Sequence, residues 1–270
     1  MSGDTRLVDA HNHLHDPRLD PHRAEIDRAL TQLGPPLAVV NGTREDDWPA
    51  VIALAAARPE VFPSLGLHPW HVHERSDAWL AHLETMLEQL RPRVGVGEIG
   101  LDAWIPDHDL DDQRTVLLDQ IRLAARHDLP VTIHCIQAWG HLLAALREAP
   151  LPERGFLLHA YGGPAEMVTP FAKLGAYFSF SPAHLAAKKH ARREVFRGIP
   201  AERLLVETDA PDMTPPDEYN RHPLPPDATG RRPNHPANLA VTYEELARLR
   251  GLPADDLAAL VEENFHRLFG

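Results

Sequence analysis

Three observations predict that this chain is an α/β protein whose parallel strands close into a (β/α)8 barrel. Short apolar runs alternate with stretches of helical periodicity, a pattern typical of a parallel sheet. Eight such runs occur, and eight is the number of strands that closes this kind of barrel. The chain has 270 residues, close to the roughly 250 that the architecture typically needs. We therefore expect one barrel domain over residues 1–270.

Each predicted strand is a short apolar run that ends near a polar residue. In chain order the runs are LVDAH (7–11), PLAVVNG (36–42), VFPSLGLH (61–68), RVGVGEIGLD (93–102), PVTIHC (130–135), GFLLHA (155–160), AYFSFSP (176–182) and RLLVETDAP (203–211). The helical pattern is clearest over 112–130, where Leu117, Ile121 and Ala124 mark one face. Pro130 ends that helix and opens the next strand. An open doubly wound sheet is the alternative, but it would leave two sheet edges unpaired.

Capping signals predict two helix starts. Asp111 or Asp112 is expected to cap the helix that follows the acidic segment DHDLDD. The tetrapeptide TYEE at 242–245 is typical of a capping box and is expected to open the closing helices.

Composition narrows the functional classes. A hydrophobic fraction of 43% and a charged fraction of 24% are those of an ordinary soluble globule. No apolar run approaches the ~18 residues of a membrane span, and the polar start MSGDTRL is no signal peptide. The lone Cys135 excludes an internal disulfide framework and suits a reducing cytosol. We expect a cytoplasmic protein with no membrane association, and no obligate protein partner is evident from the sequence.

The formal net charge of −12 gives no basic face for long duplex nucleic acid. It leaves open an enzyme that grips only the end of a strand around bound cations.

Polar side chains gather where the predicted strands end, which in a barrel is the active-site face. His11 and His13 are two residues apart on a strand, so they project to the same side. The polar residues at or just after the strand ends are His11, His13, Asn41, His68, Glu98, His134, His159, Ser179, Ser181 and Asp209. Cys135 follows His134 directly and is expected to pack on the opposite side of its strand.

Six of these side chains form a predicted metal-ligand set: His11, His13, Glu98, His134, His159 and Asp209. Taken singly, each histidine is as compatible with a hydrogen-bonded core position, and Glu98 with a buried ion pair. Together they suffice for two divalent ions, with Glu98 offering one oxygen to each. Mixed nitrogen and oxygen ligands favour Zn²⁺, Mn²⁺ or Fe²⁺ and tolerate Mg²⁺. Glu207, two residues before Asp209, is expected as a partner inside the barrel or as a group that orients a histidine.

Substrate contacts are predicted from the loops at the same face. His68, in GLHPW, is expected to face the substrate more than the metal. The segment 211–236 contains eight of the chain's 26 prolines and follows the eighth strand. Its cations Arg221, Arg231 and Arg232 are expected to meet a substrate phosphate, with a solvated loop as the alternative. Trp70 and Trp139 lie near strand ends and can either stack a base or pack in the core.

The motifs DAHNHLH, GLHPW, GEIGLD, PVTIHC, LHAYGG, ETDAP and ENFHRLFG occur in this order from about residue 7 to 269. Together they make the chain similar to the TatD family of metal-dependent deoxyribonucleases, a branch of the amidohydrolase-like TIM barrels. The resemblance implies that His11, His13, Glu98 and Asp209 hold one metal, and that Glu98, His134 and His159 hold the second. It also implies that single-stranded DNA is trimmed from its 3′ end.

Three departures from the family pattern concern positions that would face the substrate. Ile136 stands where the family commonly has an arginine, and HAYGG replaces H-C-F-S-G. The segment PNHP (233–236) places His235, a further candidate substrate contact, where a glutamate is usual. Hydrolysis is therefore more firmly implied than DNA as its substrate.

The predicted mechanism is metal-assisted hydrolysis. Two ions ~3.5–4 Å apart would polarise the scissile ester and lower the pKa of a water toward ~7. Asp209 and Glu98 are the predicted catalytic residues, with Asp209 accepting the proton of the nucleophile. The alternatives are hydrolysis of a carboxylic ester, amide or lactone, including the ester of a charged tRNA, and a metal-binding scaffold without turnover. A barrel isomerase is a further alternative, but it would not need six ligands.

Overall fold

Every apolar run predicted as a strand contains one in the computed structural model, which describes residues 6–270; residues 1–5 of the predicted domain lie outside the described part. The strands are β1 (Val8–Asn12), β2 (Leu37–Asn41), β3 (Val61–Leu65), β4 (Gly95–Asp102), β5 (Val131–Ile136), β6 (Phe156–Leu158), β7 (Ala176–Phe180) and β8 (Leu204–Val206). All seven consecutive pairs are parallel, in the order β1 to β8.

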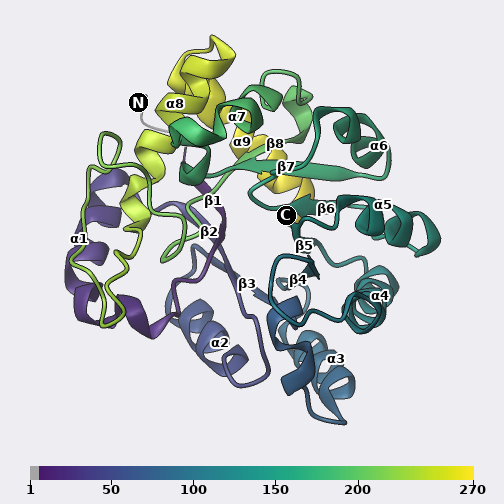
Figure 1. The fold of residues 1–270 in the computed structure, drawn as a ribbon. Helices are drawn as coiled ribbons and strands as arrows, with labels where there is room; N and C mark the ends of the chain where they lie inside the picture. The colour runs from purple at the N-terminus through teal and green to yellow at the C-terminus, as the bar shows by residue number, and fades with distance from the viewer. Residues whose placement is uncertain (1–5) are drawn as a thin grey trace.

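The two ends of this sheet meet just past the strand ends. The backbone N–H of Asp209 donates to the carbonyl of His11 at 2.9 Å, and that of His13 donates to the carbonyl of Ala210 at 2.7 Å. Figure 1 shows the strands surrounded by the helices. The sequential strand order and this seam exclude the open doubly wound sheet and confirm the (β/α)8 barrel.

The helices alternate with the strands, as the periodicity predicts. They are α1 (Arg23–Leu33), α2 (Trp48–Ala57), α3 (Trp79–Leu90), α4 (Leu110–His127), α5 (Trp139–Glu148), α6 (Val168–Lys173), α7 (His190–Val195), α8 (Leu239–Arg250) and α9 (Ala254–Phe269). In α4, Leu117, Ile121 and Ala124 are buried against the barrel. None of the described helices is long and apolar enough to cross a membrane.

Both predictions of helix starts are wrong. Asp109 caps α4, because its carboxylate accepts hydrogen bonds from the backbone N–H groups of Asp111 and Asp112. The helix α8 begins at Leu239, three residues before the predicted box, so Thr242 lies inside it and donates to the carbonyl of Asn238 at 3.0 Å.

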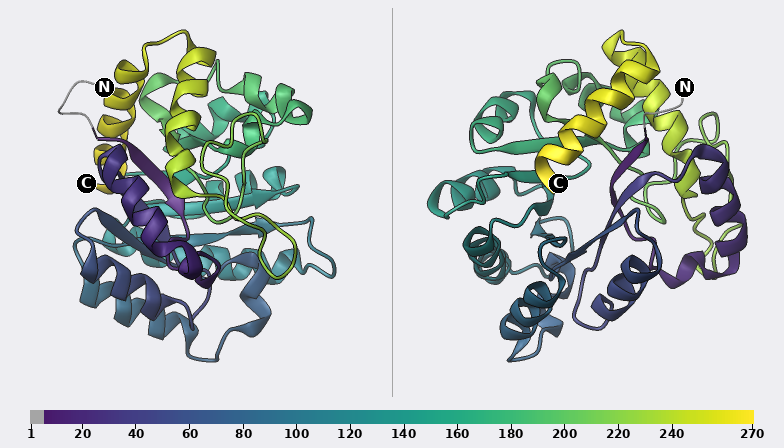
Figure 2. Two further views of the ribbon diagram at one scale, coloured as in Figure 1. Left: turned by 90° about the vertical axis from the view of Figure 1, so that its left-hand side faces the viewer. Right: turned by 180° about the vertical axis from the view of Figure 1, so that it is seen from behind.

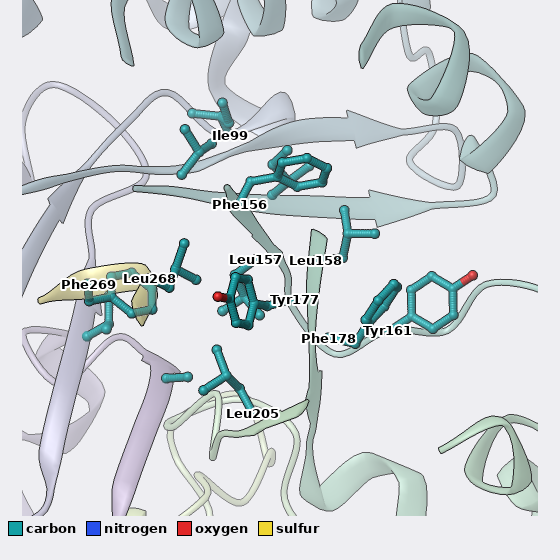
Figure 3. Close-up of a cluster of buried hydrophobic side chains, with 14 of the residues drawn as sticks. Ile99, Phe156, Leu157, Leu158, Tyr161, Tyr177, Phe178, Leu205, Leu268 and Phe269 are labelled. Carbon is teal, nitrogen blue, oxygen red and sulfur yellow. The ribbon is translucent and has the colours of Figure 1, made fainter. Parts of the chain in front are cut away.

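The opposite end of the barrel is closed by α9. Seen from behind in Figure 2, this helix lies across the sheet. The ring of Phe269 packs 5.4 Å from the ring of Phe62, at the start of β3. Figure 3 shows Leu268 and Phe269 in one buried cluster with Tyr177 and Leu205. Because this end is filled by apolar side chains, a polar site is expected at the carboxyl ends of the strands.

Candidate metal centre

A cavity of about 760 Å³ opens at the carboxyl ends of the strands. Its lining residues come from strand ends and from the loops that follow them. Five members of the predicted metal-ligand set line the cavity: His13, Glu98, His134, His159 and Asp209. The sixth member, His11, is fully buried directly beneath them.

Glu98 lies at the centre of the cluster and turns one carboxylate oxygen to each of two histidine pairs. Its Oε2 is 3.4 Å from Nε2 of His11 and 3.3 Å from Nε2 of His13. Its Oε1 is 2.9 Å from Nε2 of His159 and 3.0 Å from Nδ1 of His134. The carboxylate is therefore arranged as a bridge between two groups of nitrogen ligands.

Asp209 completes the first of these groups. Its Oδ1 is 3.3 Å from Nε2 of His11 and 3.5 Å from Nε2 of His13. The residue has a positive φ of 52°, and its backbone N–H is held by the seam between β1 and β8. The structure thus brings all six predicted side chains to one place.

The chemistry of this cluster fits divalent cations. Nδ1 of His11 is buried without a hydrogen-bond partner among the described residues, and its buried Nε2 faces the carboxylates of Glu98 and Asp209 at 3.4 and 3.3 Å. Burial alone would raise the pKa of Glu98, but the charge of His159 holds that pKa well below its usual range. Burial likewise opposes ionisation of Asp209, yet the hydrogen bonds from His11 and His13 lower its pKa. Two buried carboxylates ringed by imidazoles form a donor set for ions such as Zn²⁺ or Mn²⁺.

Asp102 supports His134 from outside the cluster, and no sequence pattern assigned it a role. Its Oδ2 accepts hydrogen bonds from Nε2 of His134 at 2.9 Å and from Nε1 of Trp70 at 2.7 Å, and its Oδ1 accepts from the backbone N–H of Trp104 at 2.8 Å. Burial would raise the pKa of Asp102, but the bonds from His134 and Trp70 lower it to about 2. An ionised acceptor keeps the proton on Nε2 of His134, which leaves Nδ1 free as a ligand.

Glu207 has the supporting position predicted for it. Its Oε1 is 3.5 Å from Nδ1 of His159, and its other oxygen accepts a hydrogen bond from the hydroxyl of Ser179. The carboxylate therefore orients His159 with its Nε2 toward Glu98.

Comparisons with known proteins agree with this geometry. The family model described as "TatD related DNase" matches residues 8–270. The chain belongs to the TatD family. It is 32% identical over 267 residues to the "uncharacterized metal-dependent hydrolase YjjV" of Escherichia coli K12, covering 98% of each chain. It is 31% identical over 236 residues to the "3′-5′ ssDNA/RNA exonuclease TatD" of Escherichia fergusonii, covering 86% of each. The crystal structure of E. coli YjjV superposes with a TM-score of 0.87 at 30% identity, covering 98% of each chain.

Membership of the TatD family confirms the resemblance drawn from the motifs and makes this chain a metal-dependent hydrolase.

His68 lies closer to the cluster than expected for a residue that faces the substrate more than the metal. Its Nε2 is 3.3 Å from Oε1 of Glu98, and it also lines the cavity. Burial lowers the pKa of His68 to about 4, so the ring is neutral near pH 7.

Two exposed tryptophans line the cavity of this TatD-family hydrolase. Trp70 is 44% exposed and Trp104 is 65% exposed, and among the described residues the one other exposed large apolar side chain is Leu252, at 37%. Trp139 does not line the cavity, because its ring packs 4.8 Å from that of Tyr161. Trp104 was missed in the sequence, where no pattern separates an exposed loop aromatic from a packed one.

Three of the predicted substrate contacts lie elsewhere. Arg221 forms a two-pronged ion pair with Glu244 at 2.6 and 2.7 Å, and Arg232 lies 3.6 Å from Asp217. His235 is buried, and its Nδ1 accepts a hydrogen bond from the backbone of Ala237. None of Arg221, Arg232 and His235 is among the cavity-lining residues.

The course of the proline-rich loop explains this result. Oδ1 of Asn238, at the start of α8, accepts hydrogen bonds from the backbone N–H groups of Arg221 and His222, which ties the middle of the loop to the outside of the barrel. The parts of the loop that do line the cavity are Asp212, Met213 and Arg231. Other polar residues there that we did not single out include His15, Asp16, Arg18, Arg44 and Asp47.

Proposed function

We propose that this TatD-family hydrolase is a 3′–5′ exonuclease that removes nucleotides from single-stranded nucleic acid. Single-stranded DNA is the preferred substrate. The observation that carries the proposal is one cavity in which a bridging carboxylate, Glu98, lies beside exposed tryptophans. The family relative from E. fergusonii that is named as a 3′-5′ ssDNA/RNA exonuclease supports the same function.

We assign the metal positions as follows. His11, His13, Glu98 and Asp209 would hold one divalent ion, and Glu98, His134 and His159 would hold a second. When bound, such ions supply Lewis-acid polarisation of the phosphoryl group and make water more acidic.

The chain's own residues handle the proton and the charge. Asp209 is ionised and lines the cavity, so its carboxylate can accept the proton of the attacking water. Nδ1 of His68 accepts a hydrogen bond from the backbone N–H of Trp70 at 3.1 Å, so its proton sits on Nε2. This N–H can donate to a phosphate oxygen in the cavity, and Arg231 supplies positive charge at the wall, where Arg18 is already paired with Asp16 and Asp212.

The tryptophans give the preference for a single strand. Trp70 is anchored through its indole N–H to Asp102, and Trp104 through its backbone to the same carboxylate. Stacking of a base on an exposed aromatic ring contributes about 1–3 kcal/mol and tolerates any base. The face of a base is covered by its neighbours in a duplex and is free to stack on a tryptophan only in a single strand.

The test is a product profile. A 12-nucleotide single strand labelled at its 5′ end, incubated with the purified protein and Mn²⁺, Mg²⁺ or Zn²⁺, should shorten from its 3′ end in single-nucleotide steps. Asp209→Asn should abolish this shortening, while Asp112→Asn, which alters a carboxylate paired with Arg75 outside the cavity, should not. Turnover of carboxylic esters or aminoacyl-tRNA without shortening of any oligonucleotide would overturn the proposal and favour carbonyl chemistry.

A further inference from the structure

The segment between β7 and β8 has a charge opposite to that of the chain as a whole. Residues 187–197 carry five lysines and arginines against one glutamate, in a protein whose formal net charge is −12. Two of the three lysines of the chain are adjacent here. We call Lys188, Lys189, Arg192 and Arg193 the basic ridge; they flank the start of α7 (Figure 1).

The cations of the basic ridge lack the partners that most arginines of this protein have. Arg197, in the same segment, pairs with Glu194 at 2.6 Å. Within residues 6–270, no carboxylate lies within ion-pair distance of the four ridge residues. Their positive charge is therefore available to an external anion.

The ridge lies next to the mouth of the candidate metal centre. Nε2 of His184, at the base of this segment, lies 3.0 Å from the carbonyl of Tyr161, two residues after His159. A β-carbon placed on Gly162 would lie 3.6 Å from Nη1 of Arg192, so that guanidinium runs alongside the loop after β6. Lys189 is half-buried and near enough to Asp209 for the two charges to interact.

We propose that the basic ridge binds backbone phosphates of the substrate strand upstream of the 3′ nucleotide that enters the cavity. This inference rests on the proposed function and adds the path of the strand. A polyanion is repelled by a protein of net charge −12 unless it follows a local run of unpaired cations. The basic ridge is such a run, and it begins beside the reacting end.

The test compares substrates of two lengths. In the variant Lys188→Ala/Lys189→Ala/Arg192→Ala, the KM for a 15-nucleotide oligothymidylate should rise about 5- to 20-fold, while KM for a trinucleotide and kcat for both stay within about 2-fold. Arg197→Ala, which removes a cation already paired with Glu194, should leave both KM values unchanged and is the matched control. Equal effects on both lengths, or none on either, would overturn the proposal.

A binding measurement separates this proposal from the exonuclease assignment. Fluorescence anisotropy of a labelled, phosphorothioate-linked 15-nucleotide strand with the metal-loaded protein gives the slope of log K against log salt. This slope should become shallower by about 0.7 for each phosphate that the variant no longer neutralises. Ridge-dependent binding without strand shortening would sustain the ridge and refute the exonuclease. Ridge-dependent binding to phosphatidylserine vesicles, with unchanged oligonucleotide binding, would refute the ridge as a nucleic-acid surface.

Discussion

Asp102 is the residue whose replacement tests the construction of the site most directly. Its buried carboxylate accepts hydrogen bonds from His134, Trp70 and Trp104, at 2.9, 2.7 and 2.8 Å. In Asp102→Asn the shape is kept, but the amide has one accepting oxygen. Its NH₂ group must face a donor, either the backbone of Trp104 or the pair formed by His134 and Trp70.

The expected magnitude follows from the hydrogen bonds that the substitution removes. A hydrogen bond to a charged group contributes about 1.5–3 kcal/mol, which corresponds to a factor of roughly 10 to 100 in an equilibrium constant. Replacing the outer partner of a metal-ligating histidine typically weakens metal affinity by a similar factor of about 10 to 100. If the amide turns its NH₂ toward His134, the weakening should be at the upper end of this range.

The assay is metal affinity measured by competition with a chromogenic chelator, together with oligonucleotide kinetics at saturating metal. We expect weaker metal binding and, because Trp70 loses its anchor, a raised KM. Asp112→Asn provides the control for removal of a carboxylate outside the cavity. A folded Asp102→Asn protein with wild-type metal affinity would refute the role assigned to this carboxylate.

Four further outcomes are expected. Glu98→Gln places an amide NH₂ toward one histidine pair, so elemental analysis should find less bound metal and activity should fall by about 100-fold or more. Trp104→Ala should raise KM about 5- to 100-fold for a normal oligonucleotide but not for one whose 3′ residue is abasic; equal effects on both substrates would rule out base stacking. Burial lowers the pKa of His184 to about 4, below the ~6.5 of the unfolded chain, so its contribution to stability is complete above pH ~6.5 and is lost as the pH falls toward 4. Between pH 7 and 5, urea titration should therefore show a loss that is smaller in His184→Gln by about 2 kcal/mol. Arg221→Ala removes an exposed ion pair, so it should change kcat/KM less than 2-fold and the free energy of unfolding by at most about 1 kcal/mol. A large loss of activity would instead show that Arg221 contacts the substrate.

The six clustered side chains could be chosen from the sequence because a parallel barrel fixes where strand ends lie. Once His11, Glu98 and His159 were placed at the ends of apolar runs, the architecture required them to meet at one face. Asp102 lies four residues after Glu98, in the motif GEIGLD, so its position at a strand end could be predicted. Its hydrogen-bond donors could not be predicted, because they come from other strands and loops.

The loops could not be predicted in the same way. A loop has no periodicity, and the position of Arg221 depends on a hydrogen bond to Asn238, which belongs to a helix start that capping signals misplaced. His235 lies in the same loop, and no sequence pattern indicated that its ring would be buried and accept a hydrogen bond from the backbone N–H of Ala237. The basic ridge was visible in composition, but its position beside His159 follows from the packing of His184 on Tyr161.

The joining of the first and last strands has a consequence for how the protein matures. His11 and Asp209 are about 200 residues apart along the chain, yet their backbones are bonded to each other. During synthesis His11 must wait for about 200 further residues to be added before Asp209 can reach it. Metal ions bound by both His11 and Asp209 would then stabilise the closed barrel, by about 2.7 kcal/mol at an ion concentration about 100 times the Kd. Metal loading would thus follow closure of the barrel and protect the closed barrel from proteases.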